Sequence, residues 1–357
     1  MLFESWRGRY ADSPRALSES LPGSARLRRT WVSAGDSSFP SDVEVVRRHS
    51  SAYFAKLLTT ELLVANDIIS QHRVKGPRTR YLQTWHGTPL KRIGLDESQP
   101  QYAGAAAHMR RMRRDVAKWD YLISPSPACT QIFRQAFDYR GTVLETGSPH
   151  NDVLRSPDAD GLRGRVRARL GISDGVTAVL YAPTWRDDQN LESGGFGQEP
   201  GIDGARLQRL LPDGTVLLTR MHPNVVRRPS YDAPGFALDV SAHPSVAELY
   251  LAADVLVSDY SSVVYDFAVT GKPIVLFPYD LERYEKTVRG LYFDYPSWAP
   301  GPVVETTPDL ARALLEVTAT SWQPTASYAA FVAKFCPWED GHASARVWKA
   351  VLEARAG

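Results

Sequence analysis

The stretch VLVSDYSSVVYDFAVTGKPIVLF, residues 255–277, holds two short apolar runs separated by a polar turn and a helical segment. The runs at 255–258 and 274–277 are too short for helices, and they are typical of strands buried on both faces of a parallel sheet. Residues 263–270 between them fit the helix of a β-α-β unit. The stretch therefore predicts an α/β protein built on a parallel sheet.

The same alternation of short apolar runs and longer helical stretches continues on both sides of this unit. We expect further strands at residues 2–5, 30–33, 44–46, 62–65, 81–84, 121–124, 143–145, 177–182, 216–220 and 236–239. We expect further helices at residues 13–21, 127–137, 162–170, 205–211, 246–252, 308–318 and 343–353. Repeated βα units of this kind predict doubly wound parallel sheets.

The chain divides near its middle. Its 357 residues are more than one ordinary domain needs and suit two. Gly, Pro, Asn and Asp punctuate residues 146–152, after which the βα pattern starts again. We therefore expect an N-terminal Rossmann-like domain at 1–147, a second one at 148–335 and a last segment, 336–357, that contains a helix.

Composition and charge exclude several classes of protein. A hydrophobic fraction of 43% and a charged fraction of 23% are ordinary for a folded globular chain. The net charge of +2 lacks the basic excess of a nucleic-acid-binding protein. The first residues lack the features of a signal peptide, and no run of about 18 apolar residues could span a membrane, so we expect a cytoplasmic protein.

Common catalytic and metal motifs are also missing from the sequence. It has no P-loop, no Gly-x-Gly-x-x-Gly after a strand and no His-Glu-x-x-His, which argues against P-loop enzymes, dinucleotide oxidoreductases and zinc proteases. Cys129 and Cys336 are too few for a disulfide framework or a metal cluster, and we expect reduced thiols. No metal site is expected.

The first polar cluster, residues 83–91, follows the strand expected at 81–84. Gly87 allows a sharp turn, Thr88 follows it, and Pro89 could open a helix, which would place His86 at a strand end above a helix N-terminus. Such a histidine can accept a proton near neutral pH. A structural, hydrogen-bonded histidine fits the pattern equally well.

Two further clusters follow strands of the second half. Arg186 comes after the strand at 177–182, where it could clamp a phosphate or pair with a neighbouring aspartate on the surface. Arg220 and His222 end the strand at 216–220, where both could reach one anion, or could be an ordinary loop arginine and histidine. Each cluster alone is a weak signal.

The fourth cluster contains Asp259, Ser261 and Ser262, between the strand at 255–258 and the helix at 263–270. A serine here could cap the helix, and the free N–H groups of the same helix end could bind an anion. Because strand ends of an open α/β sheet lie along one edge, we expect the four clusters to converge between the two domains. Positive charge, hydrogen-bond donors and one base around an anion are what phosphoryl transfer requires.

Together these clusters resemble the CDP-glycerol glycerophosphotransferases, the family of teichoic-acid polymerases and primases. The motifs that carry the resemblance are Thr84-Trp85-His86-Gly87-Thr88-Pro89-Leu90-Lys91, Ala182-Pro183-Thr184-Trp185-Arg186, Arg220-Met221-His222-Pro223 and Ser258-Asp259-Tyr260-Ser261-Ser262. The resemblance implies a GT-B fold, in which two Rossmann-like domains face an interdomain cleft, the second holds the donor nucleotide and the last helix crosses back to the first.

The same resemblance implies a reaction. A polyol phosphate, expected to be glycerol phosphate, would pass from a CDP-polyol to a hydroxyl of a lipid-linked or polymer acceptor, with release of CMP, in the synthesis of a teichoic-acid-like wall or capsule polymer. His86 would be the general base. His222, the second catalytic candidate, would stabilise the donor phosphates together with Arg220 and could assist the departure of CMP. Arg186, Ser261 and Ser262 would hold the diphosphate, and Asp259 would orient its neighbours or contact the donor polyol. No cofactor is implied, although a loosely held Mg²⁺ is compatible with the fold.

Arg110, Arg111, Arg113 and Arg114 form a basic segment that is expected to be helical. They could face anionic lipid head groups, which would make the protein peripheral on the inner face of the membrane, or a phosphate-rich acceptor, or only solvent. Three alternatives to glycerol-phosphate transfer also stay open: ribitol-phosphate transfer from CDP-ribitol, sugar transfer from a nucleotide sugar on the same fold, and a non-catalytic binding protein.

Overall fold

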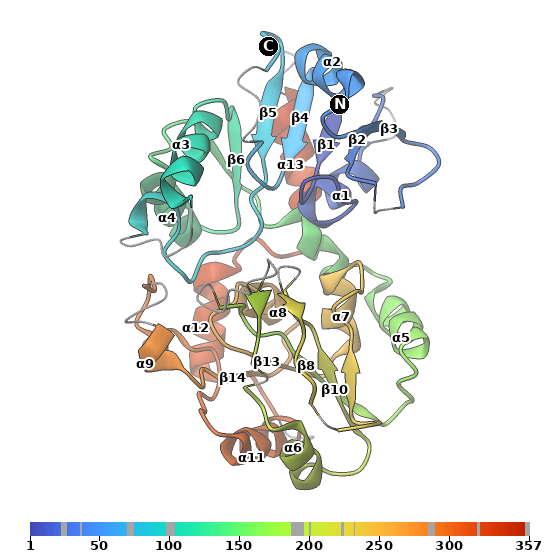
Figure 1. Ribbon diagram of the computed structural model, residues 1–357, viewed down its shortest axis with the longest axis vertical. Helices are drawn as coiled ribbons and strands as arrows, with labels where there is room; N and C mark the ends of the chain where they lie inside the picture. The colour runs from blue at the N-terminus through green and yellow to red at the C-terminus, as the bar shows by residue number, and fades with distance from the viewer. Residues whose placement is uncertain are drawn as a thin grey trace.

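The structure is a computed structural model that describes residues 1–22, 27–35, 38–69, 75–97, 104–186, 196–199, 201–222, 225–231, 233–284, 290–319 and 322–353. Two parallel sheets, one above the other in Figure 1, organise these residues. The α/β fold class predicted from residues 255–277 is therefore confirmed.

The first sheet has seven strands in the order β3-β2-β1-β4-β5-β6-β7, and every neighbouring pair is parallel. Its strands are β1 (Leu2–Glu4), β2 (Thr30–Ser33), β3 (Glu44–Arg47), β4 (Leu62–Ala65), β5 (Arg80–Gln83), β6 (Tyr121–Ser124) and β7 (Thr142–Glu145). All seven strands expected before residue 147 are present, with ends shifted by one residue at most.

The second sheet has five parallel strands in the order β12-β10-β8-β13-β14. They are β8 (Thr177–Tyr181), β10 (Thr215–Thr219), β12 (Ala237–Asp239), β13 (Val255–Ser258) and β14 (Ile274–Leu276). Every residue of β13 and β14 is buried, as their continuous apolar runs predicted. Two short strands that the sequence did not reveal, β9 (Phe196–Gly197) and β11 (Val225–Arg227), pair with each other outside this sheet.

Helices cover both faces of each sheet. The helices of the first half are α1 (Asp12–Glu19), α2 (Ser51–Thr59), α3 (Ala105–Val116) and α4 (Pro127–Phe137), with the 3₁₀ helix η1 (Gly94–Asp96). Those that follow are η2 (Pro149–Arg155, 3₁₀), α5 (Ala159–Arg169), α6 (Gly204–Leu210), α7 (Val246–Ala252), α8 (Val263–Ala268), α9 (Leu281–Arg283), α10 (Tyr295–Trp298), α11 (Thr307–Val317), α12 (Ala326–Phe335) and α13 (Ala343–Glu353). In the first half, α2, α3 and α4 share one apolar cluster with the strands, and α1 and α13 share another.

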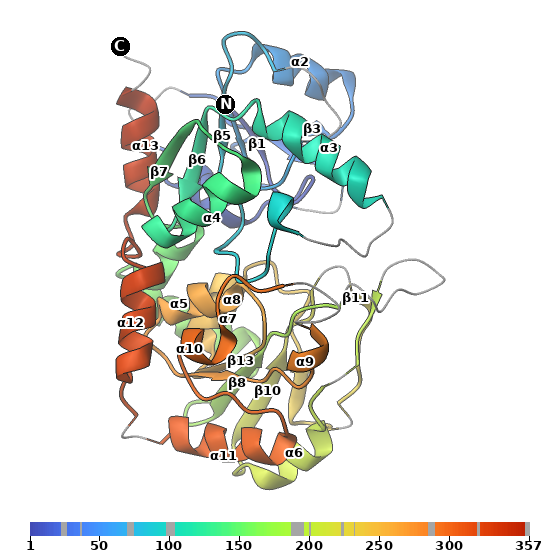
Figure 2. The ribbon, with the colours of Figure 1, turned by 90° about the vertical axis from the view of Figure 1, so that its left-hand side faces the viewer.

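The end of the chain returns to the first sheet. Figure 2 shows α12 beside the second half and α13 beside the first. Val347, Trp348 and Val351 of α13 pack with Phe3, Leu17 and Trp31 in one buried cluster. The Trp348 indole also donates a hydrogen bond to the Leu17 carbonyl at 3.1 Å. The crossing helix is thus present, whereas the domain limits at residues 147 and 335 stay a prediction.

One local expectation was wrong. No helix follows Pro89: residues 88–93 form a loop that leads to η1, so His86 does not lie above a helix N-terminus. Ser262 takes the N-cap position of α8, as expected for one of the two serines, although its side chain makes no capping bond. Because α8 has only six residues and ends at Ala268, it is also shorter than the helix expected at 263–270.

Neither a membrane-spanning helix nor a cluster of metal-binding side chains occurs among the residues described. Cys129 and Cys336 are both buried and are not joined in a disulfide.

Candidate active site at the junction of the two sheets

His86 lies just beyond the carboxyl end of β5, between two indole rings. Its ring centroid is 4.3 Å from that of Trp85 and 4.8 Å from that of Trp6. Its Nδ1 lies 2.7 Å from the backbone oxygen of Asn66. Because a carbonyl oxygen can only accept, Nδ1 must carry a proton, and in the neutral ring the lone pair is on Nε2. The backbone therefore selects the tautomer in which Nε2 is the base.

The loop after His86 contacts the second half of the chain. Gly87 has φ +127°, and a Cβ added there would lie 3.1 Å from both Cβ and Oγ of Ser262. Thr88 beside it is buried. Further along, the backbone N–H of Arg92 donates to Gly290 at 2.8 Å, and that of Tyr292 donates to Leu90 at 2.9 Å. The first and fourth polar clusters therefore meet, as the sequence predicted.

His222 and Arg220 lie beyond the end of β10, near the same loop. Burial, followed by the positive charges of Lys91, His86, Arg220 and Arg9, lowers the pKa of His222 to about 3. This histidine is therefore neutral near pH 7. The Arg220 guanidinium donates to the Val240 and His243 carbonyls at 3.2 and 2.9 Å, and burial lowers its pKa.

The charges that act on His222 come from both halves of the chain. Arg9, His86 and Lys91 belong to the first half, and Arg220 belongs to the second. A group of cations that disfavours protonation of a neighbouring histidine is the field that favours an anion. The third cluster is thus electrostatically linked to the first, across the junction.

Arg186 is fully buried and holds two loops together. Its Nε and Nη2 donate to the two carboxylate oxygens of Asp280, both at 2.8 Å, and Nη2 also donates to Asp259 at 2.9 Å. The other oxygen of Asp259 accepts from the backbone N–H groups of Thr184 and Tyr260, at 2.7 Å each. The guanidinium therefore contacts protein carboxylates. The surface partners expected for Arg186 were the neighbouring aspartates. These residues, Asp187 and Asp188, lie outside the described residues.

Ser261 and Ser262 are partly exposed at the start of α8. The Ser261 hydroxyl accepts from the Val263 N–H at 3.5 Å, which is long for a hydrogen bond. Both hydroxyls therefore remain suited to bind a ligand at the edge where Gly87 approaches.

Sequence reasoning missed a second group of charges at the junction. His150 Nδ1 lies 3.2 Å from Asp12 Oδ1, and His150 Nε2 lies 3.2 Å from Asp266 Oδ1. Glu339 is close by and accepts from the Ser148 N–H at 2.9 Å. In the sequence, residues 146–152 indicate a domain boundary and residues 147–152 fit the family motif, but no local pattern indicates the acidic partners of His150.

Arg110, Arg111, Arg113 and Arg114 are exposed on α3, whereas Met112 and Val116 of the same helix are buried. These four arginines form no ion pair with any described residue. The helix, which flanks the first sheet in Figure 1, thus presents an unneutralised basic surface.

Comparisons with known proteins agree with this architecture. Residues 1–353 match the family model of CDP-Glycerol:Poly(glycerophosphate) glycerophosphotransferase. The chain is 37% identical to the teichoic acid glycerol-phosphate transferase of Staphylococcus aureus, over 98% of this chain and 92% of that protein. It superposes on the wall teichoic acid polymerase TagF with a TM-score of 0.90 and 33% identity, over 99% of this chain and 88% of that one.

More distant structures share the fold alone. Sucrose-phosphate synthase from Thermosynechococcus elongatus, a GT-B glycosyltransferase, is 18% identical and superposes with a TM-score of 0.52 over 99% of both chains. The predicted GT-B fold is therefore confirmed. The full-length family match, the shared fold and the order of the four polar clusters lead to one conclusion: this chain belongs to the CDP-glycerol:poly(glycerophosphate) glycerophosphotransferase family.

Proposed function

We propose that this enzyme, which transfers glycerol phosphate from CDP-glycerol in teichoic acid synthesis, uses His86 Nε2 as its general base. The observation that carries the proposal is the 2.7 Å contact of His86 Nδ1 with the Asn66 carbonyl, which leaves Nε2 as the proton acceptor. The acceptor hydroxyl gives its proton to Nε2 while its oxygen attacks the phosphorus that bears glycerol. The bond from that phosphorus to the bridging oxygen breaks, and CMP leaves with the electron pair.

The donor diphosphate lies, in this proposal, between Arg220 and His222 on one side and Ser261 and Ser262 on the other. Support comes from the cations that surround His222 and from the partly exposed hydroxyls next to Gly87. A neutral His222 can donate a hydrogen bond to a phosphate oxygen. Once the negative charge of the bound diphosphate has raised its pKa, His222 can take up a proton from solvent and donate it to the leaving oxygen of CMP.

Arg186 and Asp259 act through other groups in this proposal. Because the Arg186 side chain is fully buried and its nitrogens contact Asp259 and Asp280, its role is to hold residues 184–186 against residues 259–260. Breaking such a buried pair leaves an uncompensated charge, which is strongly destabilising. Asp259 fixes the turn before Ser261 through its two backbone N–H partners.

The acceptor is a hydroxyl of a glycerol-phosphate polymer or of its lipid-linked primer. The four exposed arginines of α3 support an anionic contact, since each lacks an acidic partner among the described residues. A polyglycerol-phosphate chain and an anionic membrane surface share the same phosphate chemistry. Contact with either would place the protein at the inner face of the membrane as a peripheral protein.

A donor comparison tests this function. Release of CMP would be measured from CDP-glycerol and CDP-ribitol, and release of UDP from UDP-glucose, each with a lipid-linked acceptor that already carries one glycerol phosphate. We expect release with CDP-glycerol and a new phosphodiester signal in the ³¹P NMR spectrum of the product. Preference for CDP-ribitol would show that ribitol phosphate, and not glycerol phosphate, is the transferred group. Consumption of UDP-glucose alone would replace phosphate transfer with sugar transfer.

A further inference from the structure

His150 joins the two halves of the molecule through its two ring nitrogens. It lies in η2, and its partners Asp12 and Asp266 come from α1 in the first half and α8 in the second. Exposed fractions of 12%, 14% and 11% show that all three side chains are nearly buried. Ser13 Oγ also lies 2.8 Å from His150 Nδ1, and the Asn151 amide donates to Asp266 at 3.1 Å.

The charge of this group is fixed. Burial alone would lower the pKa of His150, but Asp266 and Asp12 raise it well above its ordinary value. Burial would raise the pKa of Asp12, but His150 lowers it to about 2. A cation therefore lies between two carboxylates at neutral pH, with Glu339 as a third acidic neighbour. Removing the cation would leave two nearly buried carboxylates facing each other.

One side of this group leads to His86. The second oxygen of Asp12 accepts from the Trp6 indole N–H at 3.1 Å, and the Trp6 ring lies against the His86 ring. The Trp6 backbone N–H donates to the Asn66 side chain at 2.9 Å, and the backbone oxygen of the same Asn66 accepts from His86. Two contacts thus connect Trp6 to the base.

The backbone around these residues is strained. Trp6, Asp12 and Trp85 have φ values of +46°, +61° and +52°, in the left-handed region. Residues other than glycine take such conformations at a cost in free energy, and keep them only where surrounding contacts require it. Asp12 is held by its contacts to His150 and Trp6 and by the backbone N–H of Ser13.

The other side of the group leads to the loop that faces His86. Asp266 is the fourth residue of α8, whose N-cap Ser262 touches Gly87. His150 is therefore connected to the base along two routes, one through α1 and Trp6 and one through α8 and Ser262.

We propose that His150 is a positioning residue for His86: it fixes α1 and α8 relative to each other, and so sets the position of His86 Nε2 relative to the bound donor. The inference rests on the proposed role of His86 as the base. His150 itself contacts no reacting atom in this account.

A double-mutant cycle tests the inference. The kcat of CMP release from CDP-glycerol would be compared for the wild type, His150→Gln, His86→Gln and the double variant. A misplacement of about 1 Å can lower the rate by roughly 10²-fold, so we expect His150→Gln to lower kcat about 10- to 100-fold with little change in KM. In the His86→Gln background the same change should cost less than about 2-fold. Equal losses in both backgrounds, or no loss in either, would overturn the inference.

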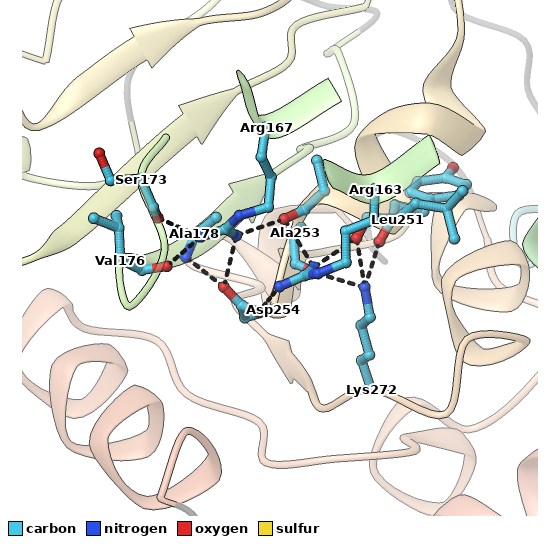
Figure 3. A network of polar contacts seen from close by, with 11 residues as sticks. Arg163, Arg167, Ser173, Val176, Ala178, Leu251, Ala253, Asp254 and Lys272 are labelled. Atoms are coloured by element: carbon cyan, nitrogen blue, oxygen red, sulfur yellow. Dashed lines mark hydrogen bonds and ion pairs between the residues drawn. The ribbon is translucent and has the colours of Figure 1, made fainter. Parts of the chain in front are cut away.

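Companion variants separate positioning from folding. His150→Arg keeps a cation between the carboxylates and should restore most of kcat. Trp6→Phe keeps a ring against His86 but removes the hydrogen bond to Asp12, and should lower kcat. Asp254→Asn is the matched control. Asp254 pairs with Arg163 and Arg167 (Figure 3) where β13 begins, at the end of the strands opposite the candidate active site. This substitution should lower thermal stability and leave kcat unchanged.

The ring ¹⁵N NMR signals of His86 decide the inference independently of turnover. In the donor-free protein they should move in His150→Gln and in Trp6→Phe, and should stay in place in Asp254→Asn. Unmoved signals in both His150→Gln and Trp6→Phe would overturn the inference. Full activity of His86→Gln would instead refute the proposed base, so the two failures are distinguishable.

Discussion

His222 is a histidine kept neutral by its surroundings until an anion arrives. Burial and neighbouring cations lower its pKa to about 3, so His222 is a neutral imidazole at pH 6 in the free enzyme. The diphosphate of the donor would offset those cations and raise the pKa of His222 again. We expect up to about one proton to be taken up for each CDP-glycerol bound at pH 6.

Calorimetric titration measures this uptake directly. The binding enthalpy at pH 6 should differ between buffers of different ionisation enthalpy, and His222→Asn should remove the difference. Identical enthalpies in all buffers for the wild type would show that His222 stays unprotonated in the complex.

Candidate site residues could be predicted from the sequence where they directly follow a strand. Contacts between residues that are distant in the sequence could not. His86, Arg220, His222 and the serines could be found because parallel strands end at one edge of a sheet. By contrast, Asp280 and Asp266 lie far along the chain from Arg186 and His150. The sequence near Arg186 offered Asp187 and Asp188 as partners, which lie outside the described residues, and only the folded chain shows that Asp259 and Asp280 contact it.

The side-chain nitrogens of Lys272 and Arg163 bind the backbone carbonyls at the end of α7. Lys272 donates to the carbonyls of Tyr250, Leu251 and Ala253 at 3.1, 2.7 and 2.7 Å, as Figure 3 shows in part. Arg163 donates to the carbonyls of Leu251, Ala252 and Ala253. These are the last carbonyls of a helix, which lack partners within the helix itself.

Substitution of Lys272 should therefore lower the free energy of unfolding without lowering kcat. Lys272→Met keeps the apolar stem but removes the hydrogen bond to the Tyr250 carbonyl and one of the two donors to the Leu251 and Ala253 carbonyls, at a cost of about 1–3 kcal/mol. Equilibrium unfolding in denaturant would measure the loss, and kcat should stay within about 2-fold of the wild type, since such carbonyls contact no substrate. A lower kcat in a fully folded variant would mean that the contacts of Lys272 affect catalysis at the candidate active site.

Elements were predictable from the sequence in proportion to their apolar periodicity. β13 and β14 were found because their apolar runs are buried on both faces, whereas β9 has only two residues and two of the three residues of β11 are exposed. The helix expected after Pro89 failed for a different reason. Residues 90–92 pair instead with residues 290–292 of the second half, a long-range contact that overrides the local signal.

Glu339 ties the crossing segment before α13 to the junction between the halves. Burial and the charge of Asp266 raise its pKa to about 7, against a lowering by His150. An acid whose pKa is higher in the folded state binds its proton more tightly there. Its contribution to stability is therefore complete below pH 4.5 and is lost as the pH rises through about 7.

Glu339→Gln should remove this pH dependence. The amide oxygen can still accept from Ser148, and the variant carries no ionisable group. Relative to this variant, the wild type should lose up to about 3 kcal/mol of unfolding free energy between pH 4.5 and pH 8. Denaturant titrations of both proteins at several pH values measure the difference, and parallel curves would refute a buried, protonated Glu339.

The molecule as a whole places the proposed base of the first sheet beside the proposed anion-binding groups of the second. The proposal that His86 is the general base is tested most directly by the steady-state kinetics of CMP release from CDP-glycerol for the wild type and His86→Gln. We predict that the variant loses roughly 10²- to 10⁴-fold in kcat while the KM for CDP-glycerol stays within a few-fold. Turnover at the wild-type rate, or a loss confined to KM, would contradict the claim that His86 takes the proton of the acceptor hydroxyl.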